Sequence, residues 1–507
     1  MSVFFSLVNL DFIYYLICFF NKLPFYTFII LSVFIIFSLL VQVILSTNFF
    51  FTKLLNIIKF LFLMLLLSLT SLFLARFFFF YFFNNSLHLF LVNQKISQVY
   101  LGNICTFTQT FSLSCNITLF GSALLVLGFF SSFISLIYLG DRKLISNLNN
   151  SVFFCYFLIC TLFLTNTHNL LVMLLSFECI FFPSLYFVYT YGYAKRVDIS
   201  IKILFIWTAL GALLMLFISL YLWVTYNTLD FFSLKNCSFT IYEKYFIYIS
   251  FFLGLGIKIP IFPFYYWLTK VHVEAPAGFS MFLSGFLVKT AFYFLYFIYT
   301  IFNVYVINLF FIIWILFCIG EVSIKMWVQV DFKKLIALAT VQEMNLMLLF
   351  LFLLNPIHLK FLSIFMVLHG LLSALMFFCV DLIQVRTQTR NIYLLSGVGT
   401  KFNFLRLFCW TILLFYFGFP LTTKFIIEWY IGSYLLLYFT WVGLIIFFIL
   451  IVIGNIGFFK IMLIILYGTP HKEAPMILST DLTKVELWTW FFFLSMLLLL
   501  MLVFYIC

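Results

Sequence analysis

Ionisable side chains inside apolar segments are the residues of this sequence whose type and spacing could do chemistry. Lys258 and Lys289 lie in consecutive apolar segments, and Pro260 and Pro263 interrupt the first one. A cation in hydrocarbon costs roughly 2.5–3.5 kcal/mol even on the lenient insertion scale. A proline inside a helix removes a backbone donor and frees the carbonyl four residues back. Burial favours neutral lysine and a nearby carboxylate favours the charged form, so such a lysine is expected to hold and release a proton beside a hydrated path.

Carboxylates and a histidine extend this set of ionisable residues. Glu178 sits between apolar flanks, with Pro183 five residues on. Glu428 follows Pro420 by eight residues and is expected to be the counterpart of Lys258, with the opposite charge. Intramembrane ionisable groups are functional candidates by default. The candidate proton-handling residues are Glu178, Lys202, Lys258, Lys289, Glu343, His369 and Glu428.

Each candidate also has a structural interpretation. The lysines could sit in fixed ion pairs, Glu178 could be a protonated or hydrogen-bonded carboxyl near a helix end, and a lone membrane histidine is often a satisfied core residue. Lys202, near a helix start, could instead reach to the membrane interface. His369 falls between Lys289 and Glu428 in a run of titratable groups, which favours function. The weaker candidates are Lys424 and Lys460, and the residues interpreted as topology and capping are Asp331, Lys333 and Lys334.

The composition is that of a polytopic membrane protein. Hydrophobic residues make up 66% of the chain and charged residues 8%, and the mean hydropathy is +1.23. Apolar runs exceed the length of a membrane span many times over. The net charge of +12 is better explained by basic loops that orient helices than by nucleic acid, which we do not expect as a partner.

The apolar runs predict an all-α transmembrane bundle of 14 or 15 helices. Prolines interrupt two of them, which lie five helices apart and indicate two inverted five-helix repeats. The predicted domains are 1–150 with a polar loop at 84–118, repeat one at 151–301, repeat two at 303–467, and a last helix at 486–507. The predicted helices are 3–20, 24–46, 54–83, 119–139, 151–166, 169–190, 200–224, 244–268, 276–301, 303–322, 335–354, 360–383, 404–434, 437–467 and 486–506.

Loop charges alternate along the chain. Most of the intervening loops, near 166, 303 and 356, carry little charge, and the loop at 226–243 is mixed. This alternation supports the helix count between 119 and 485 and predicts that the basic loops face the inside, which is the matrix in a mitochondrion. The basic loop residues are Arg142, Lys143, Lys195, Arg196, Lys270, Lys325, Lys333, Lys334, Arg386, Arg390, Lys401, Lys472 and Lys484.

The sequence carries no motif for a cofactor or a metal. No G-x-G-x-x-G after a strand, P-loop, H-E-x-x-H or C-x-x-C-H is present. The 11 cysteines include no C-x-x-C pair, which argues against a zinc or iron–sulfur site. Cys105 and Cys115 share one loop and could pair or remain free thiols. The 79 phenylalanines, with many Ile, Tyr, Asn and Lys, suggest an A+T-rich genome such as an organelle's.

Short motifs follow one another along most of the chain. They are Phe177-Glu178 with Pro183, Lys258-Ile-Pro260, Trp267-Leu268, His272-Val-Glu-Ala-Pro276, Gly285 to Lys289, Asp331 to Ala337, His369-Gly-Leu371, Ser373-Ala374, Arg386, Thr389-Arg390, Gly418-Phe-Pro420, Phe425 and Glu428. Over roughly residues 119–467, in order, these motifs resemble a known family, chain 4 of mitochondrial NADH:ubiquinone oxidoreductase, the antiporter-like proton-pumping subunits of respiratory complex I. The turn Glu274-Ala-Pro276 distinguishes it from the sister chain 5, which typically has Gly-Pro-Thr-Pro there.

The resemblance implies fourteen helices in inverted repeats of five and proton pumping without redox cofactors in this chain. It implies that Glu178 and Lys258 form an interacting pair, that Lys289 is the central relay, and that Glu428 is the exit-side acid. NAD, FMN, iron–sulfur clusters and ubiquinone are expected in other subunits. The implied partners are the other membrane-arm subunits, including the chain 5 and chain 2 antiporter-like neighbours, accessory subunits, and lipids such as cardiolipin. The implied location is the mitochondrial inner membrane.

The sequence departs from the family pattern near the second broken helix. The family usually has His-Met where this chain has Glu343-Met344. The usual glycine before the last acid is Ile427, and a usual asparagine is Lys424. Because of these changes, the charges of the proton-handling groups in the predicted second repeat differ from those that the family pattern implies. Residues 1–83 carry little resemblance.

Two other classes of function fit parts of the sequence. A stand-alone Mrp-type cation/proton antiporter shares these motifs, although an organelle-like composition argues against it. A membrane scaffold without transport needs no intramembrane lysines. Co-purification with a large NADH-oxidising assembly would argue against the stand-alone antiporter. Ordered water along Lys258, Lys289 and Glu428 would argue against the scaffold.

Overall fold

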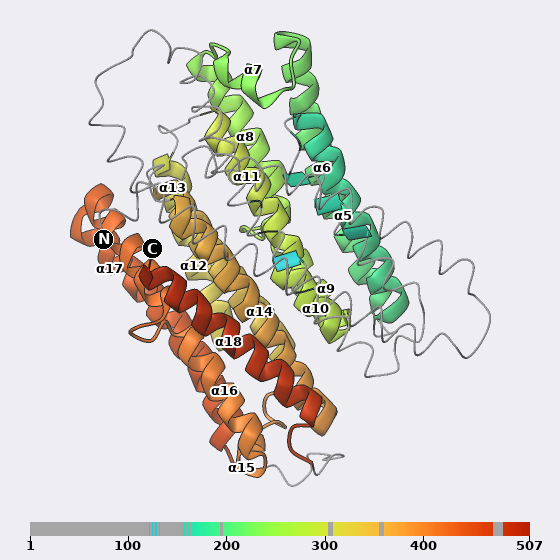
Figure 1. The fold of residues 1–507 in the computed structure, drawn as a ribbon, viewed down its shortest axis with the longest axis vertical. Coiled ribbons are helices and arrows are strands. Elements are labelled where there is room, and N and C mark those ends of the chain that lie inside the picture. Colours follow the sequence, from blue (N-terminus) through green and yellow to red (C-terminus); the bar gives the residue numbers. More distant parts are fainter. Residues whose placement is uncertain are drawn as a thin grey trace, which may run out of the picture. The chain divides into compact units, whose positions relative to one another are not determined.

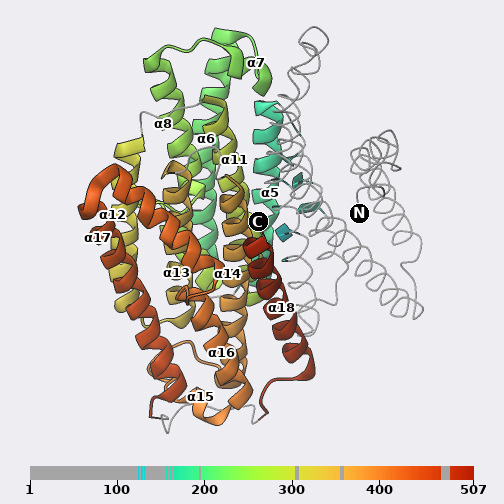
Figure 2. The same ribbon diagram turned by 60° about the vertical axis from the view of Figure 1, so that its left-hand side comes forward.

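The computed structural model describes residues 169–192, 196–302, 308–353, 359–469 and 480–506, together with scattered helical positions between 121 and 167. Within these ranges the regular elements are helices, and strand pairing is limited to two isolated bridges. Figures 1 and 2 show their arrangement. The elements are α5 Leu170–Tyr191, α6 Val197–Tyr226, α7 Phe231–Asn236, α8 Ile241–Lys258, α9 Tyr266–Glu274, α10 Ala277–Phe282, the π-helical segment η1 Leu283–Leu287, α11 Val288–Phe302, α12 Asn308–Trp327, α13 Phe332–Leu353, α14 Leu359–Thr387, α15 Val398–Lys401, α16 Asn403–Tyr416, α17 Thr423–Tyr467 and α18 Lys484–Ile506.

Seven helical stretches of the described part are long and apolar enough to cross a membrane. The predicted all-α transmembrane bundle is therefore confirmed for these residues. The three predicted N-terminal helices, the polar loop at 84–118 and the Cys105–Cys115 question lie outside the described residues.

The helices that carry buried ionisable groups form the core. Residues 277–299, 335–353 and 368–383 are buried throughout, and Figure 1 shows α13 and α14 running side by side. By contrast, only about a third of the apolar window is buried in α6 and in the second half of α17. Polar groups in a membrane face the bundle interior, whereas uniformly apolar helices tolerate lipid. The positions of Lys289, Glu343 and His369 thus explain which helices are central.

Pro260 and Pro263 split the predicted helix 244–268 into α8 and α9. Proline at these two positions removes the donors that would reach Gly256 and Ile259. Both freed carbonyls accept instead from the amide of Ile261, at 3.4 and 2.6 Å. The indole of Trp267 donates to the Ile257 carbonyl at 2.6 Å. Backbone and ring donors therefore satisfy the first break from within.

Pro420 splits the second predicted helix, 404–434, into α16 and α17. Gly418 and Leu421 have φ values of 64° and 88° in the intervening turn, and only glycine adopts that region without strain. The side-chain hydroxyl of Thr422 accepts from the amide of Phe425 and caps α17. The carbonyl of Tyr416, which Pro420 frees, lies at the end of α16.

The run from Thr423 to Tyr467 does not stay straight. A Cβ on Gly432 would lie 3.7 Å from the ring of Phe448, although a straight helix would separate two such positions by roughly 24 Å. The helical run must therefore turn back on itself between them, and Figure 2 shows its two halves running in different directions. The sequence predicted two separate helices, 404–434 and 437–467, and the turn between them is helical rather than a loop.

Glycines let α14 approach the π-helical segment closely. A Cβ on Gly370 would lie 2.8 Å from the Gly285 carbonyl and 2.6 Å from Leu127. A Cβ on Gly285 would meet the Gly370 carbonyl at 3.3 Å. This contact fixes the distance between α14 and the segment that precedes Lys289.

Basic side chains join three loops at one end of the helices. Arg390 donates to the Val273 carbonyl at 2.6 Å, and Lys333 donates to the Ala275 carbonyl. Cations at a helix C-terminus satisfy its last carbonyls. Asp331 accepts from the Lys333 amide at 2.9 Å, as expected for a capping role. The loops after α9, α12 and α14 therefore share one side, as the predicted charge alternation requires.

Short elements were not predicted. The chain forms α7 within the loop at 226–243 and α15 within the connection before α16. Each has six residues or fewer, so neither carries a periodic apolar pattern long enough to read.

We expect Gly370→Ala to loosen the bundle, because the added methyl meets a backbone carbonyl that cannot rotate away. Overpacking of this kind costs roughly 1–3 kcal/mol. Thermal denaturation of the purified protein should show a lower midpoint for Gly370→Ala, whereas Gly432→Ala, which meets only ordinary van der Waals contacts, should not change it. Equal midpoints for both variants would contradict the tight contact.

Candidate functional site

The first ion pair joins α5 to the end of α8. The ammonium of Lys258 lies 2.5 Å from the Glu178 carboxylate. The rings of Phe177 and Phe181 face the same ammonium, at 4.1 and 4.4 Å, and add cation–π attraction. The Lys258 side chain is fully buried, and the Glu178 side chain is 18% exposed. The pair is thus balanced in charge and reaches the protein surface on its carboxylate side.

Lys289 lies at the start of α11, directly after the π-helical segment. Its ammonium donates to the Ser284 carbonyl, and to the Ser373 hydroxyl at 3.4 Å. Lys289 is fully buried, and Glu343 is the carboxylate that acts on it electrostatically. Among the described residues, no carboxylate forms an ion pair with Lys289. Neutral oxygens stabilise an ammonium less than a carboxylate does, so the charge of this lysine is less well balanced than that of Lys258.

A second ion-pair cluster lies beside the turn at Pro420. Lys424 donates to the Glu343 carboxylate, which comes from α13. The side chains of Lys424 and Glu343 are 1% and 2% exposed. Glu428, one turn further along α17, lies 3.5 Å from the same ammonium. One lysine therefore stands between two carboxylates from two helices.

Tyr416 forms the other wall of this cluster. Its carbonyl accepts from Lys424, and its ring lies 4.3 Å from that ammonium. The Tyr416 hydroxyl donates to Gln342 at 3.1 Å, and Phe458 packs on its ring at 4.4 Å. The carbonyl freed by Pro420 is thus held in place and used as a lysine ligand.

Two buried histidines lie near these lysines. His369, on α14, interacts electrostatically with Lys289 and Lys424. His272 stacks on Phe377 at 4.5 Å and interacts with Lys289. Neither ring nitrogen of either histidine has a hydrogen-bond partner among the described residues. His272 was not a predicted candidate, because nothing in its helical segment reveals that it is buried.

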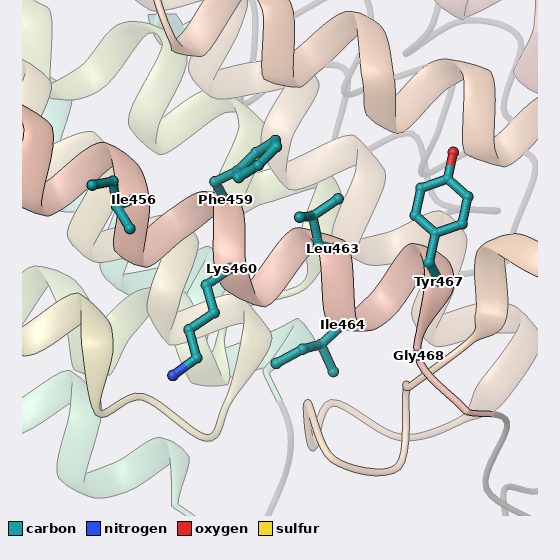
Figure 3. Close-up of a pocket in the computed structure, with 7 residues that line it drawn as sticks. All are labelled: Ile456, Phe459, Lys460, Leu463, Ile464, Tyr467 and Gly468. Carbon is teal, nitrogen blue, oxygen red and sulfur yellow. The ribbon is translucent and has the colours of Figure 1, made fainter.

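Two other lysines stand apart from the buried groups. Lys202 is exposed on α6, and no described contact joins it to the other candidates. Lys460 is exposed on α17 and lies 5.4 Å from the ring of Trp327. Figure 3 shows Lys460 and Ile464 on the opposite side of α17 from Phe459. They line a shallow groove of about 460 Å³ that holds none of the buried acids, so the groove does not coincide with the ionisable site.

A third polar cluster was missed. Tyr265 donates to Glu321 at 2.6 Å, Lys325 donates to the Tyr265 hydroxyl at 2.5 Å, and Lys325 also pairs with Glu321. Glu321 and Lys325 lie four residues apart on α12, a spacing that places them on one face of a helix. That spacing was the available signal. The cluster lies beside the first break, because Tyr265 precedes α9.

The described groups are of the kinds that can hold and exchange protons. Ammonium and carboxylate groups alternate, and a change of charge on one alters the protonation of the next because the interior dielectric is low. Among the described residues, no group of three or more His, Cys, Asp or Glu side chains could hold a metal ion.

Comparison with known proteins identifies similar chains. A family model described as NADH:quinone oxidoreductase/Mrp antiporter, TM, matches residues 167–454. NADH-ubiquinone oxidoreductase chain 4 of Paramecium tetraurelia is 32% identical over 383 residues, which cover 75% of this chain and 80% of the relative. The chain 4 of Arabidopsis thaliana is 31% identical over 259 residues, 50% of this chain and 52% of the relative.

Solved structures share the fold at low identity. A chain of respiratory complex I from Thermus thermophilus aligns with a TM-score of 0.61 and 16% identity, over 76% of this chain and 83% of that chain. A chain of the Mrp complex from Dietzia sp. aligns with a TM-score of 0.64 and 14% identity, over 76% and 82%.

We expect Ser373→Ala to weaken the hold on the charged form of Lys289, since the hydroxyl is the described side chain that accepts from it. The lost hydrogen bond is worth about 1 kcal/mol, so proton movement into sealed vesicles should slow several-fold. Ser323→Ala removes a buried serine that bonds only within its own helix and should leave the rate unchanged. Equal rates in the two variants would rule out this role of Ser373.

Proposed function

The chain belongs to the chain 4 family of NADH-ubiquinone oxidoreductases, and we propose that it moves protons across the mitochondrial inner membrane as a core membrane-arm subunit of respiratory complex I. Oxidation of NADH and reduction of ubiquinone in other subunits drive the movement. The family is established by the 32% identity to the Paramecium chain and by the match over residues 167–454. The fold is that of the membrane subunits to which the chain aligns.

One observation supports the proton route above the others. Each broken helix brings a buried lysine against a carboxylate from another helix, Lys258 against Glu178 and Lys424 against Glu343. Buried lysines and carboxylates are rare in membranes unless they serve transport. Lys289, on α11, lies between the two breaks along the chain and interacts with Glu343.

The proposed route runs Glu178, Lys258, Lys289, His369, Glu428. A proton enters at the partly exposed Glu178, and its arrival weakens the pairing with Lys258. The change of charge passes through the low-dielectric interior to Lys289, which exchanges a proton with the cluster around Glu428. Waters bridge the steps that side chains do not span, above all that from Lys258 to Lys289.

The setting of the subunit is part of the proposal. This chain carries no redox cofactor, and NAD, FMN, iron–sulfur clusters and ubiquinone are held by other subunits. The basic loops face the matrix. Chain 5 and chain 2 antiporter-like subunits, accessory subunits and lipids such as cardiolipin surround it.

The stand-alone antiporter is the second candidate, and the fold shared with the Mrp complex from Dietzia sp. is compatible with it. We expect the protein instead to co-purify with an assembly that oxidises NADH. Native electrophoresis with an in-gel NADH dehydrogenase stain checks this outcome. Isolation alone, with sodium/proton exchange in vesicles, would favour the antiporter.

Removal of either member of the first pair should uncouple the subunit. In Lys258→Met and Glu178→Gln variants the remaining charge is buried without its partner, and proton pumping should fall by at least about tenfold, as for loss of a proton-transfer group. Pumping by sealed membranes is measured with a pH-sensitive dye during NADH oxidation. The content of FMN and iron–sulfur clusters should stay normal.

The matched control is Lys244→Met, which removes a lysine at the outer end of the same helix and should not change pumping. Normal pumping in both Lys258→Met and Glu178→Gln would exclude the relay and leave a structural scaffold as the better interpretation.

A further inference from the structure

The ammonium of Lys424 lies within reach of two carboxylates, those of Glu343 and Glu428. From the sequence, Glu428 was the candidate proton-handling residue of this segment and Lys424 only a weaker one. We propose that Lys424 carries protons in the second repeat by exchanging its hydrogen bond between Glu343 and Glu428. This inference rests on the proposed function and adds a residue to the route. In this exchange Glu343 gives a proton to Lys424, and Glu428 receives the proton that Lys424 releases.

The contacts of Lys424 are uneven in the way an exchanging group requires. Its ammonium donates to Glu343 and to the Tyr416 carbonyl. Glu428 Oε1 lies 3.5 Å away and has no hydrogen-bond partner among the described residues. A shift of the ammonium by well under the length of one bond brings it into hydrogen-bond range of Glu428. Of the two carboxylates near the Lys424 ammonium, one is therefore occupied by a hydrogen bond and the other is vacant.

The Tyr416 carbonyl acts as a fixed pivot for this exchange. Pro420 removes the amide that would normally bond to it, so the carbonyl remains available to the lysine in both positions. Gln342 and Phe458 hold the tyrosine ring. In the first break, by contrast, the freed carbonyls bond to the Ile261 amide, and Lys258 has no carbonyl of this kind among its described hydrogen bonds.

Charge balance explains why the exchange moves a proton. With both lysines charged, Lys289 and Lys424 neutralise Glu343 and Glu428. When Lys289 gives up its proton, the remaining three groups carry one excess negative charge in a buried site, which favours protonation of a carboxylate. The proton from Lys289 passes through water to Glu343, forming a carboxyl O–H there, so that Lys424 remains charged beside charged Glu428. Lys424 then transfers an N–H proton to Glu428, forming a carboxyl O–H, and the neutral amine takes a proton from protonated Glu343. Lysine charge is thus restored and one proton has moved outward.

The packing around Lys424 leaves little room for another carrier. Lys424, Glu343 and Tyr416 are all buried, and the helix α17 holds both Lys424 and Glu428 on successive turns, four residues apart. His369 acts electrostatically on Lys424 but bonds to no described residue. It precedes this cluster in the proposed route and can adjust the balance between the two carboxylates.

The decisive variants are Lys424→Arg and Lys424→Met in the assembled complex. Arginine keeps the positive charge and the donors but does not release a proton in proteins. If Lys424 carries protons, both variants should lose at least about tenfold in protons pumped per NADH oxidised. If Lys424 only fixes the two carboxylates, Lys424→Arg should retain most pumping while Lys424→Met loses it, and the proposal is overturned.

Lys460→Arg, on the same helix but exposed, controls for the substitution itself and should pump normally. The amount of assembled complex on native gels is measured for each variant. Loss of pumping in Lys258→Met with normal pumping in Lys424→Arg would overturn this inference and leave the proposed function intact. Normal pumping in Lys258→Met and Glu178→Gln would instead count against the proposed function.

A measurement on the unaltered complex decides the matter if Lys424→Arg does not assemble. High-resolution structures of the complex at rest and during NADH oxidation locate the Lys424 ammonium directly. We expect it to bond to Glu343 in one state and to Glu428 in another, with the Tyr416 carbonyl contact kept in both. An ammonium that stays on Glu343 in every state overturns the proposal.

Discussion

The need to neutralise buried lysines controls this structure more than any other constraint. An ammonium in a membrane interior must meet a carboxylate, a carbonyl or water, and breaking a buried ion pair costs roughly 3–5 kcal/mol. Lys258 and Lys424 each meet a carboxylate from another helix, whereas Lys289 meets only neutral oxygens. The pairs hold α5 to α8 and α13 to α17. The lysine without a carboxylate, Lys289, lies between them in the chain.

The helix arrangement follows from the same requirement. Helices with ionisable groups in their middle must be surrounded by protein, and residues 335–353 around Glu343 are accordingly buried throughout. Close packing of α14 on the π-helical segment then depends on Gly370 and Gly285, because any larger side chain would separate Ser373 from Lys289. Stability and function are therefore coupled here: the packing that excludes lipid from the core also sets the geometry of the central lysine.

The sequence predicted those features that place an energetically unfavourable residue, a charge or a proline, inside an apolar run. The prolines at 260, 263 and 420 revealed both broken helices. Charged residues in apolar runs revealed the candidates, and six of the seven are buried or half-buried in the structure. The family resemblance implied the pair of Glu178 and Lys258, which the structure contains. The residues alone could not predict the pair of Glu343 and Lys424, since that depends on how the helices turn. The role of Lys424 was underestimated because its partner Glu343 is 81 residues away. The sequence predicted a break between 434 and 437, but not that the chain stays helical through the turn of α17 there.

The unusual pair of Glu343 and Lys424 is best understood as one change rather than two. In the family pattern that the sequence resembles, a histidine stands in place of Glu343 and an asparagine in the region of Lys424. Relative to that pattern, the two departures together add one negative and one positive charge and leave the net charge of the cluster unaltered. Either change alone would bury an unpaired charge, whereas both together form an ion pair with side chains 1% and 2% exposed. The second broken helix thereby has a lysine–carboxylate pair, like the pair at the first. The difference lies in the freed carbonyl: the first break satisfies its own backbone, and the second offers that carbonyl to the lysine, which is what gives Lys424 an anchor from which to change partners.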